Sequence, residues 1–183
     1  SAPGQYEIAI DDMTVSGIVA APLIAAPAHP PAVEHTVPAT EPSSGLSRGV
    51  LEVNGLPFFP RALDYNGEKL ETIAALGFNC VRLNEPAPAH FLTDARQAGL
   101  WVICPPPVLP DVDIRDPESL PVFSSNWDRV LLWDMGSELD ESDVDELAER
   151  ARRVRACDQR AGRPLIASAD SGLRSISRHV DLL

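Results

Sequence analysis

Residues 130–140 read VLLWDMGSELD, and the interpretation of the whole chain depends on this stretch. An apolar run that contains Trp133 ends at Gly136, and a single glutamate, Glu138, then precedes a strongly acidic segment. A short apolar run followed by glycine is typical of a buried strand that ends in a loop. Glu138 is therefore either a catalytic carboxylate at the end of a strand or the first solvated charge before a helix.

Apolar runs of strand length recur on both sides of this stretch, and segments with helical periodicity separate them. Leu70, Ile73 and Ala74 fall on one face of an expected helix that ends at Gly77. Asn54-Gly55, between two apolar runs, predicts a tight hairpin turn. Further strands are expected at 78–83, 100–104, 130–135 and from 164 onward. Alternation of short apolar strands with helices predicts a parallel sheet that helices cover.

Two architectures fit this alternation, a doubly wound sheet and a (β/α)₈ barrel. No glycine-rich phosphate loop follows the first expected strand, so the main signature of a dinucleotide-binding sheet is missing. Polar or proline-rich residues follow each expected strand, as the active-site face of a barrel requires. These are residues 64–66, 84–85, 105–107, 137–138 and 168–170. We therefore expect an α/β fold of the (β/α)₈ TIM-barrel type, truncated after about five β/α units.

The first 47 residues differ in character from the rest of the chain. Residues 1–19 contain alternating apolar and polar residues around an Asp-Asp break, which predicts the C-terminal strands of a preceding β-sandwich domain. Residues 20–47 are rich in proline and alanine without periodicity, which predicts an extended linker. The partial barrel is expected over residues 48–183.

Four stretches of the chain together resemble the N-terminal half of the clan A glycoside hydrolases. These stretches are VNGLPFFPRALDYN, LGFNCVRL, GLWVICPPP and LLWDMGSELD. The clan comprises (β/α)₈ enzymes such as cellulases, mannanases and β-galactosidases, and the similarity spans roughly residues 49–183. It implies a glycoside hydrolase-like domain that acts on the O-glycosidic bonds of a poly- or oligosaccharide.

The resemblance also implies roles for individual residues. Glu138 takes the place of the family's acid/base in a retaining mechanism, which needs a second carboxylate about 5 Å away as nucleophile. The family's nucleophile ends the seventh strand, which this chain does not contain, and Ser137 replaces the asparagine that precedes the acid/base. Arg82 either braces a catalytic carboxylate or forms a structural ion pair. The expected substrate-binding residues are Arg82, Asn84, Glu85, Asp64, Tyr65, Asn66, Ser137 and Asp170.

The composition limits the possible partners. The net charge of −12 argues against nucleic acid and anionic membranes, and the prolines in 18–32 break the longest apolar patch, so no membrane insertion is expected. Cys80, Cys104 and Cys157 are far apart and lack the spacing of a zinc site. We expect no metal or organic cofactor. A carbohydrate is the expected substrate or ligand, and the protein is expected to be secreted or associated with the cell envelope.

A different class of function stays open. A TIM-barrel domain of a cell-surface protein can bind carbohydrate without cleaving it, or serve a purely structural role. Ser137 in place of asparagine favours this alternative. Under it, Glu138 is only the first charge of the acidic run that continues with Asp140, Glu141 and Asp143, where acidic residues favour a helix N-terminus.

Overall fold

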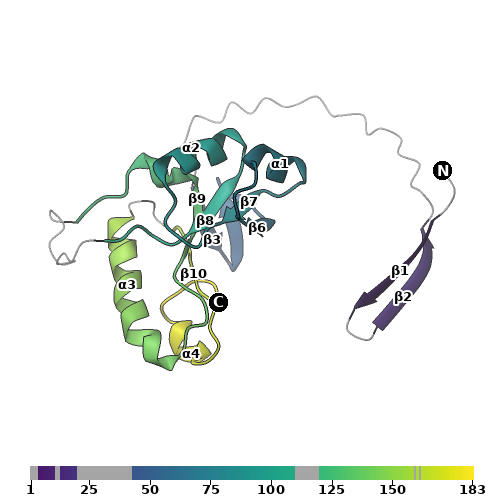
Figure 1. Cartoon of the computed structure of the whole chain (residues 1–183). Coiled ribbons are helices and arrows are strands. Elements are labelled where there is room, and N and C mark those ends of the chain that lie inside the picture. Colours follow the sequence, from purple (N-terminus) through teal and green to yellow (C-terminus); the bar gives the residue numbers. More distant parts are fainter. Residues whose placement is uncertain (1–3, 11–12, 20–42, 110–119, 159, 161) are drawn as a thin grey trace. The chain divides into compact units, whose positions relative to one another are not determined.

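The computed structural model describes residues 4–10, 13–19, 43–109, 120–158, 160 and 162–183 (Figure 1). The chain divides into two compact units, Ser1–Ala39 and Thr40–Leu183. In the first unit, β1 (Gly4–Ile10) and β2 (Met13–Val19) form an antiparallel hairpin. The β-sandwich to which the sequence assigned these strands stays a prediction. Residues 20–42 of the predicted linker lie outside the described residues.

The second unit opens with a three-stranded antiparallel meander. It consists of β3 (Ser44–Ser47), β4 (Val50–Val53) and β5 (Leu56–Pro57). Two-residue turns join the strands, and Arg48, Gly49, Asn54 and Gly55 all have positive φ. Type I′ hairpin turns require positive φ at both central positions. The predicted Asn54-Gly55 turn is confirmed.

Residues 44–47 correct one boundary of the sequence analysis. The prediction placed them at the end of the linker, whereas they form β3 and pair with β4 in the register Ser44↔Val53 to Ser47↔Val50. The segment reads SGLS, a composition with little strand propensity of its own. Its pairing comes from the Arg48-Gly49 turn and from the partner strand, neither of which gives a strand signal within the segment itself.

A five-stranded parallel sheet forms the centre of this unit. The strands are β6 (Ala62–Asp64), β7 (Cys80–Arg82), β8 (Trp101–Cys104), β9 (Val130–Asp134) and β10 (Leu165–Ile166), and they neighbour one another in chain order. The helices are α1 (Leu70–Ala75), α2 (Ala89–Gln97), α3 (Val144–Cys157) and α4 (Leu173–Ile176). Two short 3₁₀ turns, η1 (Ser125–Arg129) and η2 (Glu141–Asp143), flank β9.

The two faces of the sheet are covered differently. Buried side chains of α1, α2 and α3 pack with alternate strand residues such as Val81, Val102 and Trp133 in the larger apolar cluster. The other face carries a smaller cluster that includes Trp101 and Leu132, against which the meander packs. We call these the helix face and the meander face. Alternate side chains of each strand therefore belong to different cores.

The predicted TIM barrel is wrong. The described residues form a small α/β domain with an open sheet, in which β6 and β10 are the two edges and do not pair with each other. Within the described parts of the β8–β9 connection, the chain forms the 3₁₀ turn η1 and no α-helix. Strand-helix alternation and polar strand ends are common to open parallel sheets and barrels. The sequence pattern therefore indicated parallel strands correctly and gave no information about closure.

One extra residue in β9 changes which side chains reach each face. Val102 pairs with Val130, but the next residue of β8, Ile103, pairs with Leu132, so Leu131 is inserted between them. Leu131 and Leu132 both belong to the cluster on the meander face. Because a shift of one residue turns every following side chain to the opposite face, Trp133 lies on the helix face.

The inserted residue also attaches the meander to the sheet. The buried Ser44 hydroxyl donates a hydrogen bond of 2.8 Å to the backbone carbonyl of Leu131. Leu131 is fully buried, so water does not compete for this carbonyl. A buried carbonyl without a hydrogen-bond donor lowers the stability of the fold. Ser44 supplies this donor at the point where the pairing of β8 and β9 is irregular.

Replacement of Ser44 tests this attachment. Ser44→Ala leaves the Leu131 carbonyl buried without its side-chain donor, so we expect the free energy of unfolding to fall by about 1–3 kcal/mol. Ser47→Ala is the matched control, because Ser47 is exposed on the same strand and should change stability by less than about 0.5 kcal/mol. Denaturant unfolding measures both. Equal effects of the two substitutions would show that the Ser44 hydrogen bond contributes nothing.

Candidate functional site

A partly buried ion pair crosses the meander face of the sheet near the carboxyl ends of the strands. Arg82 on β7 donates through Nε and Nη2 to Oδ2 of Asp134 on β9, at 2.8 and 2.7 Å. Because β8 lies between these strands, the Arg82 side chain passes over the central strand. The Asp134 side chain is 7% exposed and that of Arg82 39%. Asp134 is thus the buried anchor, and part of the guanidinium remains available to solvent.

A backbone hydrogen bond completes the environment of Asp134. Its second oxygen, Oδ1, accepts from the backbone N–H of Gly136 at 3.0 Å. Both carboxylate oxygens therefore have donors, as a buried carboxylate requires. Asp134 was not among the predicted site residues. The sequence did contain its signal, since it is a lone carboxylate in an apolar strand and Arg82 is a lone cation in another.

An apolar cavity of about 620 Å³ lies beside this ion pair, between the sheet and the meander. Ile103, Leu132 and Ile166 contribute from the sheet, and the meander and the segment after it contribute a further set of apolar side chains. Arg82, Asp134 and Ser168 supply the polar lining. The cavity is of the size that small-molecule sites have, with an apolar lining and a few polar groups. We call it the edge cavity; its lining also includes Leu46, Val50, Leu51, Phe58, Phe59, Pro60 and Leu182.

The predicted site residues near β6 divide between the two faces. Asp64 pairs in register with Arg82 and so shares its face, where it is exposed. Tyr65 belongs to the helix face and packs edge-on against Phe91, with ring centroids 4.9 Å apart. Tyr65 is therefore a packing residue.

The other predicted residues near β6 and β7 lie in exposed turns. The backbone N–H of Asn66 donates to the Glu68 carboxylate at 2.9 Å, and this hydrogen bond is the main cause of the lowered pKa of Glu68. The Asn66 side chain donates to the carbonyl of Asp64 at 3.1 Å. Asn84 and Glu85 follow β7 and are exposed. The structure does not place these turn residues among those that line the edge cavity.

Glu138 lies in the loop that leaves β9, beside the end of β10. Its φ of +58° is in the left-handed region, which is uncommon for a residue other than glycine, asparagine or aspartate. Two hydrogen bonds hold the loop: Ser168 N–H donates to the Gly136 carbonyl at 2.9 Å, and Leu139 N–H donates to the Ser168 carbonyl at 3.1 Å. The loop thus places Glu138, which is exposed, next to a residue of the edge cavity.

The neighbours of Glu138 take different roles from those predicted. Arg82 forms its ion pair with Asp134 and not with Glu138. Ser137 is exposed in the same loop as Glu138, and the backbone of Asp170 donates to the Leu139 carbonyl at 2.9 Å. Of the predicted residues, the structure therefore brings Arg82 to the edge cavity and places Ser137, Glu138 and Asp170 in the strand-end loops close to Ser168.

The described residues contain no group of three or more His, Cys, Asp and Glu side chains that could hold a metal ion. In the same part of the chain, no helix has the length and apolar character needed to cross a membrane. All three cysteines are buried, and desolvation raises the pKa of Cys80 to about 12 and that of Cys104 to about 11. These thiols are therefore not nucleophiles at neutral pH.

Comparison with known proteins adds no assignment. No protein-family model matches the chain, and no curated protein matches its sequence.

The ion pair between Arg82 and the buried Asp134 generates a stability prediction. Arg82→Leu leaves the Asp134 carboxylate buried without its cation, so we expect the free energy of unfolding to fall by about 2–4 kcal/mol. The double variant Arg82→Leu/Asp134→Leu removes the charge as well and should recover part of that loss. Arg155→Leu is the control, because its ion pair with Asp181 is exposed and should be worth less than about 1 kcal/mol. Denaturant unfolding checks all three. A double variant less stable than Arg82→Leu would contradict the prediction.

Proposed function

We propose that the edge cavity binds a carbohydrate. The observation that carries this proposal is the Arg82–Asp134 pair at the polar end of an apolar cavity. The partly exposed guanidinium presents N–H donors, and the carboxylate beside it and the Ser168 hydroxyl add acceptors. A sugar hydroxyl both donates and accepts, so a site with adjacent donors and acceptors matches it better than a site of one kind.

The apolar lining supports the same class of ligand. Phe58 and Phe59 lie on the segment that leaves the meander, and both line the edge cavity. Phe58 packs edge-on against Trp101, which holds its ring in place, whereas Phe59 is 81% exposed. A sugar ring has an apolar C–H face as well as its hydroxyls. An exposed aromatic ring next to polar side chains can therefore contact both parts of the ligand.

The charge of the site argues for a neutral ligand. Asp134 already neutralises Arg82, and the chain as a whole carries a net charge of −12. A phosphate or another anion would compete with the buried Asp134 for the guanidinium and would meet a negative surface potential. A neutral polyhydroxylated ligand meets neither cost.

Phe59 provides the test of binding. Phe59→Ala removes an exposed ring from the edge cavity, so we expect glycan affinity to fall about fivefold or more, which is roughly 1 kcal/mol. Leu56→Ala is the matched control, because Leu56 is 69% exposed on the meander but does not line the cavity. Affinity electrophoresis against soluble polysaccharides, after a glycan array has found a ligand, gives the measurement. Absence of any glycan ligand, or equal losses in the two variants, would reject the proposal.

A second candidate function is hydrolysis of the bound glycan with Glu138 as general acid/base. Its support is the conformation of the loop, because a left-handed glutamate costs about 1 kcal/mol that the hydrogen bonds around Ser168 must offset. In the proposed retaining reaction, Glu138 protonates the glycosidic oxygen as its bond to the anomeric carbon breaks and a second carboxylate bonds to that carbon. Glu138 then takes a proton from the water that displaces this carboxylate. The resemblance to glycoside hydrolases at LLWDMGSELD supports the same role.

Glu138→Gln separates hydrolysis from binding. Glutamine is nearly isosteric but cannot donate the carboxyl proton, so turnover should fall at least about a hundredfold while glycan affinity stays the same. The loss should be smaller for aryl glycosides whose leaving group departs without protonation. Glu141→Gln is the control, an exposed acidic residue that begins η2. No turnover in the unmodified protein would leave binding alone as the function of the edge cavity. Retained turnover in Glu138→Gln would instead reject Glu138 as the general acid/base.

A further inference from the structure

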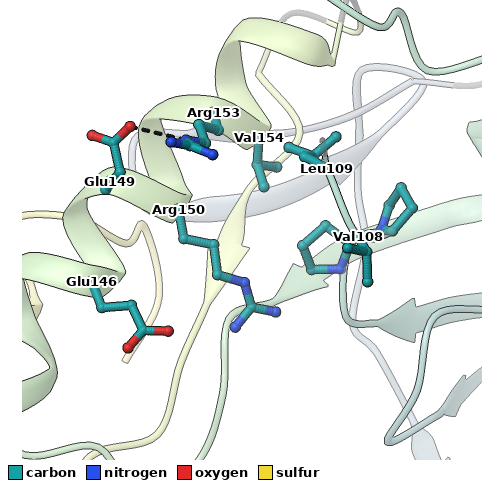
Figure 2. Close-up of a pocket in the computed structure, with 9 residues that line it drawn as sticks. Val108, Leu109, Glu146, Glu149, Arg150, Arg153 and Val154 are labelled. Atoms are coloured by element: carbon teal, nitrogen blue, oxygen red, sulfur yellow. Dashed lines mark hydrogen bonds and ion pairs between the residues drawn. The ribbon is translucent and has the colours of Figure 1, made fainter. Parts of the chain in front are cut away.

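A second hollow, of about 440 Å³, lies between α3 and the segment that follows β8 (Figure 2). It is separate from the edge cavity, since α3 packs on the helix face of the sheet. One wall consists of four residues of the proline-rich segment, and the other consists of α3 side chains. The lining residues are Pro106, Pro107, Val108, Leu109, Glu146, Glu149, Arg150, Arg153 and Val154.

The two walls differ in chemistry. The proline-rich wall is apolar, with Val108 92% exposed, and proline has no backbone N–H to donate. Val154 adds an apolar side chain from α3. All charged side chains that line this hollow therefore belong to α3. We call the two sides the apolar wall and the charged wall.

Some of the charged side chains of α3 form ion pairs with one another. Glu149 is paired with Arg153 at 3.0 Å and with Arg152 at 3.1 Å. Glu146 and Arg150 are also one turn apart, a spacing at which glutamate and arginine commonly pair. They form no ion pair in the described structure; Arg150 instead donates through Nη1 to the Met135 carbonyl at 3.2 Å.

The result is a carboxylate and a guanidinium side by side that do not satisfy each other. Figure 2 shows the side chains of Glu146 and Arg150 extending in the same direction from α3, with Glu149 turned the other way. Both residues also line a smaller adjoining hollow of about 90 Å³. Met135 holds Arg150 through one N–H, and no other described residue accepts from the guanidinium, so its remaining N–H groups can bind a ligand.

We propose that this hollow binds a small zwitterion with an apolar group, namely a free α-amino acid with a branched or aromatic side chain. The ligand's carboxylate binds the Arg150 guanidinium and its ammonium binds the Glu146 carboxylate, so that each charge meets its complement in charge-assisted hydrogen bonds. The apolar side chain contacts Val108, Leu109 and Val154. A ligand with only a negative charge would be repelled by Glu146, which would stay without a partner. A ligand with only a positive charge would be repelled by Arg150 in the same way.

Ligands that lack one charge give the first test. Isothermal titration calorimetry with the complete chain should detect L-leucine and L-phenylalanine binding weakly, with a Kd on the order of 1 mM. N-acetyl-L-leucine lacks the ammonium and L-leucinamide lacks the carboxylate, and each should bind at least about tenfold more weakly because one charged wall residue loses its partner. Glycine lacks the apolar side chain and should also bind more weakly.

Variants of the charged wall give the second test. Glu146→Gln and Arg150→Gln should each weaken L-leucine binding about tenfold, and Glu146→Gln should no longer distinguish L-leucine from N-acetyl-L-leucine. Asp145→Asn and Arg174→Gln are matched controls, because both residues are exposed and neither lines the hollow. No binding of any apolar amino acid would overturn the proposal. Equal binding of the blocked derivatives, or variants no weaker than their controls, would also overturn it. Among the described residues, Glu146 forms no hydrogen bond or ion pair that its replacement could disturb, so the test holds even if Arg150→Gln unfolds.

Discussion

The extra residue at Leu131 is the constraint on which the rest of the domain depends. In a regular strand, Val130 and Leu132 would share the helix face, and Asp134 would follow them there. The insertion instead places Leu131 and Leu132 together on the meander face, and every later residue of β9 changes sides. Asp134 therefore meets Arg82, and the bulky Trp133 enters the larger core.

Trp133 shows what the insertion contributes to the helix face. Its ring packs against Phe123 and Trp127 at centroid distances of 5.3 and 5.4 Å, and its Nε1 donates to Asp158 at 2.7 Å. The guanidinium of Arg163 lies 5.0 Å from the same ring and pairs with Asp158 at 3.3 Å. Burial lowers the pKa of Arg163, and the nearby carboxylate of Asp158 opposes that shift. This buried cation is held by the Trp133 ring, which the register of β9 places on the helix face, and by the Asp158 carboxylate, which accepts from the same ring.

The sequence contained some of these facts and lacked others. It indicated the parallel strands, the Asn54-Gly55 turn and the need of Arg82 for a partner, because periodicity, turn chemistry and a lone buried charge are local signals. It contained Asp134 as a lone carboxylate in an apolar strand but not the face that this residue occupies, since that face depends on an insertion that no pattern in VLLWDM reveals. Sheet closure was predicted wrongly for a related reason, because strand-helix alternation is the same in open sheets and barrels. The strand β3 was missed because its pairing comes from outside the SGLS segment.

The carboxyl end of β9 links the two proposed sites. Asp134 and Met135 are consecutive in the chain, so their side chains point to opposite faces of the sheet. Asp134 holds the Arg82 guanidinium at the edge cavity, and the Met135 carbonyl holds the Arg150 guanidinium at the hollow on α3. Each arginine is fixed by an atom of β9 and keeps further N–H groups for a ligand. Loss of the inserted residue would turn Asp134 away from Arg82 and would shift the Met135 carbonyl relative to α3. A single irregularity in one strand therefore sets the geometry of both sites.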